Sequence, residues 1–287
     1  MDAPVACCRP TPACRRFCRL DGRLIVGQGS IENPDTGHAY EVIDTLAQGG
    51  MSVTYLVYDY QARQLAVLKE ISSELAGRAK ARELFQREAA SLQSLQHPGI
   101  PRFHDFFVNG EGYTLVMELV HGQTLEQVPQ PSISQAIAWI IEVAEVLDYL
   151  HTRTPPMVHR DIKPANLILR HHPRQMVLID FGAVKDVTTP PGTRIATPGY
   201  SAMEQQRGTP CLQSDYFALG TTLIFLLTRT FPGRFFDKQQ GVFVGLDNTA
   251  LPRPVITVIK QLTALLPEQR PRTARDVIAL LQPLVDP

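Results

Sequence analysis

The sequence has no excess of charge of either sign and no long apolar run. Its 28 lysines and arginines balance 28 aspartates and glutamates over 287 residues, so no global field would recruit nucleic acid or an anionic membrane. The longest wholly apolar run near the C-terminal end, residues 223–227, is far shorter than the ~18 residues of a membrane span. No apolar signal region follows the first two residues. These absences predict a cytoplasmic protein with no membrane span and no nucleic-acid partner.

Cysteine is scarce outside the N-terminal stretch. Four of the five cysteines lie within residues 1–18, among several arginines. Such a cluster in a cytosolic chain favours metal over disulfides, but the paired C-x-x-C spacing of zinc sites is absent. We predict at most a weak metal site at Cys8, Cys14 and Cys18, with less than one zinc per chain; lipidation and a partly ordered basic tail are the alternatives. Residues 1–38, rich in proline and glycine, are predicted to be tail and linker.

One stretch concentrates groups that could carry chemistry. Within residues 158–167 a carboxylate, an ammonium and a carboxamide, from Asp161, Lys163 and Asn166, lie between apolar residues. Solvated turns seldom have apolar residues such as Val158 and Leu167 on both sides of their charges. We therefore expect a half-buried loop, in which unpaired charges would be costly.

The same stretch matches a known pattern. It fits H-R-D-L-x-x-x-N, the catalytic loop of protein kinases, with Ile162 in place of the leucine. A strand-like run then leads to Asp180, Phe181 and Gly182, the D-F-G signature of the same set. With both motifs in order at the usual separation, the chain resembles the bacterial-type (eukaryotic-like) serine/threonine protein kinases.

This resemblance implies an α+β, two-lobed fold. A small N-terminal antiparallel sheet with one helix is expected in residues 39–120, and a larger, mainly helical lobe in residues 121–287. The local patterns agree, because residues 40–46, 53–59 and 65–71 have strand character whereas residues 133–151, 255–266 and 273–281 have helical periodicity. The protein kinase domain is thus predicted to span residues 39–287.

The turn of the first hairpin lies where kinases place the glycine-rich loop that covers the ATP phosphates. Glycine suits this position because a backbone without Cβ can approach an anion closely. Only Gly49 and Gly50 are kept at or next to the glycine positions of the pattern, and Ala47 and Ser52 replace the outer two. A plain hairpin turn explains the loop about as well, so we expect weaker or stiffer binding of the nucleotide.

Two further segments resemble parts of the nucleotide site. Lys69 ends a strand similar to V-A-I-K, whose lysine contacts the α and β phosphates. Glu88 interrupts an apolar stripe at helical spacing and is the expected partner of that lysine. Met117, Glu118 and Val120 match the hinge that meets the adenine. The predicted ATP-binding residues are Leu46, Ala47, Gln48, Gly49, Gly50, Met51, Ser52, Val53, Thr54, Lys69, Met117, Glu118 and Val120.

The resemblance also implies a chemical role for each polar residue. Asp161 would orient the acceptor hydroxyl, Lys163 would steady the transferring phosphoryl group, and Asn166 with Asp180 would hold magnesium, or manganese as the alternative ion. The predicted catalytic set is completed by Lys69 and Glu88. The implied cofactor is ATP with magnesium, and the implied partners are proteins with serine or threonine acceptors.

The segment after the D-F-G motif resembles an activation segment. Thr188, Thr189 and Thr193 are candidate phosphorylation sites that Arg160 could bind, and an unregulated, constitutively ordered loop is the alternative. By the same resemblance, Thr197 together with Lys163 favours serine or threonine over tyrosine as acceptor, because tyrosine kinases usually replace both residues.

Further along, Glu204 is expected to pair with Arg270, and Asp215 to anchor the catalytic loop. Met203 stands where the pattern A-P-E has proline.

Two other functions are alternatives to an active protein kinase. A pseudokinase acting as a nucleotide-binding or protein-binding module is supported by the altered glycine loop and by Met203. The complete set of predicted catalytic and metal residues argues against it. A small-molecule kinase of the same fold is disfavoured by Thr197 and Glu204, which belong to elements that shape a peptide platform.

Overall fold

The computed structural model describes residues 29–49, 51–110, 112–186, 196–237 and 239–285. It divides into two compact units, the first formed by Met1–Phe85 and His104–Leu119 and the second by Gln86–Phe103 and Val120–Pro287. Residues 86–103, which the predicted N-terminal lobe included, therefore group with the second unit. The N-terminal cysteines, Gly50 and the three candidate threonines lie outside the described residues.

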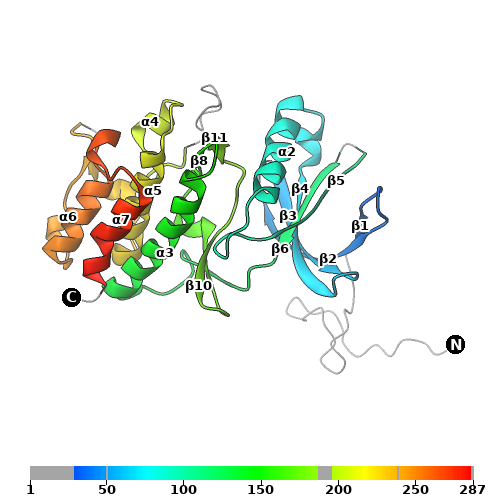
Figure 1. The fold of residues 1–287 in the computed structure, drawn as a ribbon, viewed down its shortest axis with the longest axis horizontal. Helices are drawn as coiled ribbons and strands as arrows, with labels where there is room; N and C mark the ends of the chain where they lie inside the picture. The colour runs from blue at the N-terminus through cyan, green and yellow to red at the C-terminus, as the bar shows by residue number, and fades with distance from the viewer. Residues whose placement is uncertain (1–28, 50, 111, 187–195, 238, 286–287) are drawn as a thin grey trace. The chain divides into compact units, whose positions relative to one another are not determined.

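The first unit is built on a six-stranded sheet in the order β1-β2-β3-β4-β6-β5 (Figure 1). Every strand pair with a described register is antiparallel. The strands are β1 Ser30–Glu32, β2 Ala39–Gln48, β3 Ser52–Asp59, β4 Gln64–Ile71, β5 Phe103–Asn109 and β6 Gly112–Glu118. Two helices accompany the sheet, α1 Ser73–Ala76 and α2 Ala79–Gln93, and the division between the units falls within α2.

Alternating apolar residues give this sheet its core. Tyr40, Val57, Leu68 and Val116 are buried together on one face, and each fully buried side chain of this size contributes about 1.5–3 kcal/mol. The β-branched and aromatic content of these strands suits a half-buried pleated surface.

Strand β1 lies inside the stretch that we predicted as tail and linker. It pairs with the start of β2 through residues Ser30–Glu32. Asn33, just beyond the strand, attaches the same segment to β5, because its Nδ2 donates to Asp105 Oδ2 at 3.0 Å, and Tyr40 Oη of β2 donates to the same oxygen at 2.9 Å. A three-residue strand is too short for a periodicity signal, so the sequence pattern did not indicate it.

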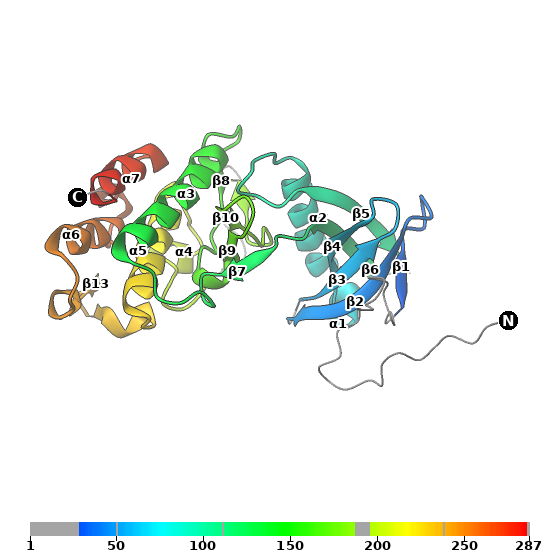
Figure 2. The ribbon, with the colours of Figure 1, turned by 90° about the horizontal axis from the view of Figure 1, so that it is seen from below.

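The second unit is mainly helical (Figure 2). Helix α3 packs against α7, α5 and strand β10. Its N-cap is Ser132, whose hydroxyl accepts from Gln135 N at 3.2 Å, and this satisfies one of the otherwise unpaired N–H groups of the first turn. The helices are α3 Ile133–His151, α4 Met203–Gln206, α5 Leu212–Thr228, α6 Arg253–Leu262 and α7 Ala274–Leu281.

Short strands and 3₁₀ turns complete the second unit. Strands β7 Gly122–Thr124, β9 Leu167–Arg170 and β10 Gln175–Leu178 form one sheet, β8 Met157–Val158 pairs with β11 Lys185–Asp186, and β12 Phe236–Asp237 pairs with β13 Val242–Phe243. The 3₁₀ turns are Pro164–Asn166, Pro232–Phe235, Leu246–Asn248, Pro267–Gln269 and Gln282–Leu284.

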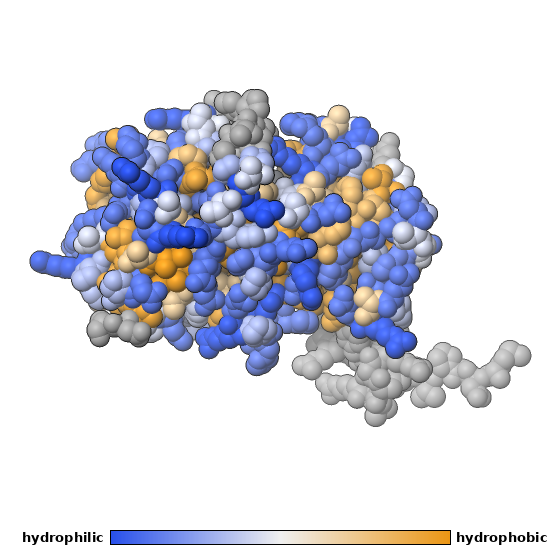
Figure 3. All heavy atoms as spheres, in the orientation of Figure 1, coloured by the Kyte–Doolittle hydropathy of each residue, from blue (hydrophilic) through white to orange (hydrophobic). Residues whose placement is uncertain are grey.

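On the face drawn in Figure 3, hydrophilic side chains predominate and apolar ones form smaller areas between them. Among the residues described, none of the helices combines the length and the apolar character that a membrane span requires.

Candidate active site

The loop with the interleaved polar residues is fixed by short secondary structure on both sides. Strand β8 leads into it, and a 3₁₀ turn at Pro164–Asn166 leads out into β9. Its apolar residues are buried, with Val158 and Ile162 each 1 % exposed and Leu167 fully buried. The half-buried loop predicted from the sequence is therefore confirmed.

Three polar side chains converge on the Asp161 carboxylate. Lys163 Nζ lies 3.0 Å from Oδ1 and 2.8 Å from Oδ2 of that carboxylate. Asn166 Nδ2 donates to Asp161 Oδ2 at 2.8 Å and to its backbone oxygen at 2.9 Å. Thr197 Oγ1 donates to Asp161 Oδ1 at 2.6 Å, from 36 residues further along the chain. The carboxylate is thus oriented by one cation, one amide and one alcohol.

Asp180, the second predicted acidic residue, comes directly after Ile179, whose main chain contacts this loop. Ile179 N donates to the backbone oxygen of Asn166 at 2.9 Å, next to the antiparallel pair β9 and β10. Asp180 has a left-handed φ of 66° and an exposed side chain, and Gly182 N donates to its Oδ1 at 3.2 Å. A non-glycine residue in this conformation is uncommon, and such residues cluster at functional sites.

Asp215, at the start of α5, holds the catalytic loop through its backbone. This fully buried carboxylate accepts from the N–H groups of His159 at 2.9 Å and Arg160 at 2.8 Å. His151 Nε2 lies 3.0 Å from the same carboxylate. Buried backbone donors require partners, and Asp215 supplies two of them where Arg160 takes a left-handed φ of 69°. The anchoring role expected for Asp215 is confirmed, whereas His151 gave no signal in the sequence.

Arg160 is surrounded by backbone partners. Its Nε donates to Ala183 O at 2.5 Å, and its own backbone oxygen accepts from Gln205 Nε2 at 2.6 Å. Burial, with a contribution from Arg87, lowers the pKa of Arg160 to about 10. The contact from Gln205 was not predicted, because a lone glutamine carries no spacing signal.

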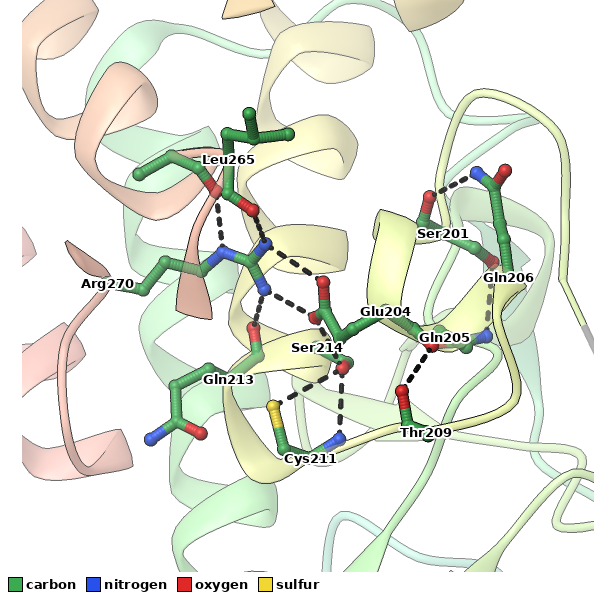
Figure 4. Close-up of polar contacts among 11 residues, drawn as sticks. Ser201, Glu204, Gln205, Gln206, Thr209, Cys211, Gln213, Ser214, Leu265 and Arg270 are labelled. Carbon is green, nitrogen blue, oxygen red and sulfur yellow. Dashed lines mark hydrogen bonds and ion pairs between the residues drawn. The ribbon is translucent and has the colours of Figure 1, made fainter. Parts of the chain in front are cut away.

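The expected ion pair between Glu204 and Arg270 is present (Figure 4). Arg270 Nη1 lies 2.7 Å from Glu204 Oε1, and Nη2 lies 3.3 Å from Oε2. The guanidinium also donates to the carbonyls of Gln213 and Leu265, and Ser214 Oγ donates to Glu204 Oε1 at 2.6 Å. Burial alone would raise the pKa of Glu204, but the hydrogen bonds from Arg270 and Ser214 outweigh it and the pKa is lowered.

The predicted nucleotide residues of the first unit lie on its sheet. Lys69 of β4 is paired with Thr54 of β3 and Leu115 of β6, and its side chain is half-buried. At the end of the β2–β3 hairpin, Gly49 N donates to Ser52 O at 2.9 Å.

The exposure of these residues differs along the segment. Leu46 is 50 % and Met51 51 % exposed. Ala47, Gln48 and Gly49 are also exposed, and Ser52, Val53 and Thr54 are half-buried. At the end of β6, Met117 pairs with Val67 and Glu118 with Ala66.

Two residues predicted for the nucleotide site, Val120 and Glu88, belong to the second unit. Val120 is 8 % exposed. Glu88 of α2 is 6 % exposed, and its Oε2 would lie 3.0 Å from a Cβ added at Gly182. Glu88 therefore lies against the glycine that follows Asp180 and Phe181, and a side chain at that position would crowd its carboxylate.

The donor set fits a divalent cation of the magnesium class. The amide nitrogen of Asn166 donates to Asp161, so the carboxamide oxygen points away from that carboxylate. Asp180 contributes an exposed carboxylate. It follows Ile179, whose N–H donates to the backbone oxygen of Asn166. Hard oxygen ligands of this kind suit magnesium. Among the described residues, no three His, Cys, Asp or Glu side chains form a separate metal cluster.

This constellation and the fold around it match a known family. The family model described as the protein kinase domain matches residues 40–283 of this chain. The chain belongs to the protein kinase family, and its two-lobed α+β fold is the one that the sequence predicted.

Bacterial serine/threonine kinases are among its relatives. Serine/threonine-protein kinase C of Synechocystis sp. is 34 % identical over 85 % of this chain and 49 % of its own length. PknA of Nostoc sp. is 36 % identical over 85 % and 47 %, and the probable kinase YbdM of Bacillus subtilis is 31 % identical over 79 % and 83 %. The chain thus spans about half the length of the cyanobacterial relatives.

A solved structure shows the same fold. The kinase domain of Mycobacterium tuberculosis PknI superimposes with a TM-score of 0.67 at 25 % identity, covering 86 % of this chain and 95 % of that one.

Proposed function

We propose that this chain is an ATP-dependent serine/threonine protein kinase, which transfers the γ-phosphoryl group of ATP to serine or threonine hydroxyls of proteins. The relatives of known name are serine/threonine kinases and support the same acceptor class. The proposal includes residues 39–287 as the kinase domain, residues 1–38 as tail and linker, and a cytoplasmic location where ATP is supplied.

The observation that carries the proposal is the hydrogen bond of an alcohol to Asp161. The Thr197 hydroxyl lies 2.6 Å from Oδ1, within the 2.6–3.2 Å that a general base needs toward the proton it receives. An acceptor hydroxyl at the same carboxylate would be oriented in the same way. Lys163, 2.8 Å from Oδ2, places a positive charge where the transferred group would develop negative charge.

The nucleotide and the metal are assigned by the chemistry of the residues. ATP with magnesium, or manganese in its place, supplies the phosphoryl group and neutralises its charge. Asn166 and Asp180 would hold the metal through oxygen atoms. Lys69 would bind the α and β phosphates and Glu88 would support that lysine.

The remaining predicted nucleotide contacts are in the hairpin and the hinge. The backbone of residues 46–54 would cover the phosphates, and the exposed Leu46 offers apolar surface to the base. Met117, Glu118 and Val120 would meet the adenine.

Replacement of the carboxylate tests the proposal. Purified protein is incubated with labelled ATP, magnesium and a generic basic protein, and the initial rate of labelling is measured for wild type and Asp161→Asn. We expect Asp161→Asn to lose about 10²–10⁴-fold in rate, the typical contribution of a general base. Glu145→Gln, at an exposed position of α3, is the control and is expected to keep the wild-type rate. Equal labelling by wild type and Asp161→Asn would leave a protein-binding or nucleotide-binding module as the function.

A further inference from the structure

Gln205 of helix α4 joins the catalytic loop to the segment that contains Thr197. Its side-chain Nε2 donates to the backbone oxygen of Arg160 at 2.6 Å and to the hydroxyl oxygen of Ser201 at 3.1 Å. Gln205 is 2 % and Ser201 7 % exposed, so both bonds are made away from solvent. A carboxamide nitrogen carries two N–H donors and no charge, and these two acceptors use both donors.

The carbonyl that Gln205 holds belongs to the peptide unit that leads into Asp161. This unit is planar and stiff, so its orientation sets the direction in which the main chain of Asp161 begins. Arg160 has a left-handed φ of 69°, a conformation that a non-glycine residue keeps only where its surroundings hold it. Asp215 accepts from the N–H of Arg160 at 2.8 Å, and Gln205 donates to its carbonyl. The main chain of Arg160 is therefore held at both ends.

A second set of contacts leads from Gln205 to the Asp161 side chain. Ser201 Oγ accepts from the backbone N–H of Thr197 at 2.8 Å, and the Thr197 hydroxyl donates to Asp161 Oδ1 at 2.6 Å. These bonds and the two made by Gln205 form a closed ring, which leaves Asp161 through its main chain and returns to its carboxylate. A connected network of this kind can be worth more than the sum of its single bonds.

Gln206, the next residue of α4, makes a different contact. Its Nε2 donates to the backbone oxygen of Ser201 at 3.0 Å, and Figure 4 shows the two glutamine side chains meeting Ser201 at different atoms. That backbone oxygen is not a member of the ring, and Gln206 is exposed. The two neighbouring glutamines therefore allow a comparison of the same residue type inside and outside the ring.

We propose that Gln205 and Ser201 are positioning residues for the phosphoryl transfer. Together they fix the direction of the Asp161 carboxylate, through its main chain on one side and through Thr197 on the other. The proposal rests on the kinase function proposed above and adds two residues that act on the reaction through Asp161. A purely structural tie would lower stability without a specific effect on kcat.

Replacing the two side chains tests this role. Gln205→Met keeps the length of the side chain and removes both donors, and Ser201→Ala removes the hydroxyl alone. Misplacing a catalytic group by about 1 Å can cost about 10²-fold in rate, so we expect kcat to fall roughly 10–100-fold and the KM for ATP to change less than about twofold. Gln206→Met is the matched control and should keep the wild-type kcat. A kcat of Gln205→Met and Ser201→Ala equal to that of the control would overturn the proposal.

The double variant distinguishes a ring from two independent contacts. Because each substitution opens the same ring, Gln205→Met combined with Ser201→Ala should lower kcat no more than about threefold beyond the more damaging single variant. Effects that multiply would contradict the ring. Rates are measured where urea denaturation shows each variant to be folded, and Ser201→Ala keeps the test available if Gln205→Met does not fold. A fall in kcat that only follows the unfolded fraction would make the contacts structural and overturn the proposal.

Amide exchange separates this proposal from the kinase function. The N–H of Thr197 donates to Ser201 Oγ, so its hydrogen exchange, measured by NMR, shows whether the ring is closed without any phosphoryl transfer. Relative to Gln206→Met, Gln205→Met should speed this exchange at least about threefold, the effect of one weakened hydrogen bond, with the amides of α3 unchanged. Faster exchange in a chain that labels no substrate would support the ring and contradict only the kinase function. Unchanged exchange and unchanged kcat, in a chain that Asp161→Asn inactivates, would keep the kinase function and overturn the proposal.

Discussion

The catalytic loop and the β2–β3 hairpin differ in how they are held. The loop around Asp161 is tied by buried partners, among them Asp215 and Gln205, that come from distant parts of the chain. At the hairpin end, residues such as Leu46 and Gly49 are exposed, and the contact across the turn is local. The groups assigned to the chemistry are therefore held by contacts from distant parts of the chain, whereas the hairpin end assigned to the phosphates is held by a contact within its own turn. Preorganisation matters most where charge develops in the transition state.

The largest effect is expected from removing the anchor of the catalytic loop. Asp215→Ala would leave the N–H groups of His159 and Arg160 and the ring of His151 without their acceptor. Each of these three unpaired buried groups costs about 1–3 kcal/mol, so we expect a loss of roughly 3–9 kcal/mol in the free energy of unfolding. Urea denaturation measures it. Asp215→Asn, which keeps one acceptor oxygen, should lose clearly less; equal stability of all three proteins would contradict the anchoring role.

The next largest loss of stability is expected from breaking the ion pair between Arg270 and Glu204. Arg270→Met would leave the Glu204 carboxylate, whose side chain is 14 % exposed, without its cation. Breaking a buried pair on one side costs about 3–5 kcal/mol, again measured by urea denaturation. Lys260→Ala removes a pair of similar length, 2.8 Å, in which both partners are largely exposed. This control should change stability by no more than the error of measurement. A loss as large as that of Arg270→Met would refute the difference between the buried and the exposed ion pair.

The ion pair of Glu204 with Arg270 predicts that the free energy of unfolding depends on pH. The pKa of Glu204 is lower in the folded state than its ordinary value of 4.5, so the folded protein binds this proton less readily than the unfolded chain does. Its stabilisation is fully present above the ordinary pKa and is lost as pH falls through the folded pKa. Between pH 7 and pH 3, wild type should therefore lose more stability than Glu204→Gln. Parallel unfolding curves over this range would show that the carboxylate is not stabilised in its charged form.

The smallest effect is expected at the hairpin. Restoring the outer glycines with Ala47→Gly and Ser52→Gly should lower the KM for ATP by less than about tenfold, which is 1.4 kcal/mol. The two changes should reduce stability by about 0.5–1 kcal/mol each, because glycine weakens a strand. Steady-state kinetics measure the first effect and thermal unfolding the second. Thr45→Gly, on β2 like Ala47, should lower stability by about as much as Ala47→Gly alone and leave the KM unchanged. An equal shift of the KM would assign the effect to a general loss of strand stability.

The local elements were predicted well where their pattern was long. The helix predicted for residues 133–151 is α3, with the same bounds, because nineteen residues sample the helical period many times. The helix predicted for residues 255–266 ends instead at Leu262. The carbonyls of Ala264 and Leu265 accept hydrogen bonds from the side chain of Arg270, a few residues further along the chain, in place of helical N–H groups. The β12–β13 hairpin and β1 were too short to leave a periodic signal.

The residue types of the site and their order along the chain were determined by the sequence alone. Asp161, Lys163 and Asn166 lie within six residues, so a local loop already brings them together. Only the tertiary structure decided that Thr197 contacts Asp161, that His151 contacts Asp215, and that Phe231 and its neighbours line a cavity. These contacts join residues tens of positions apart, and the packing of helices and turns selects them because no short-range spacing encodes which distant side chain will meet which.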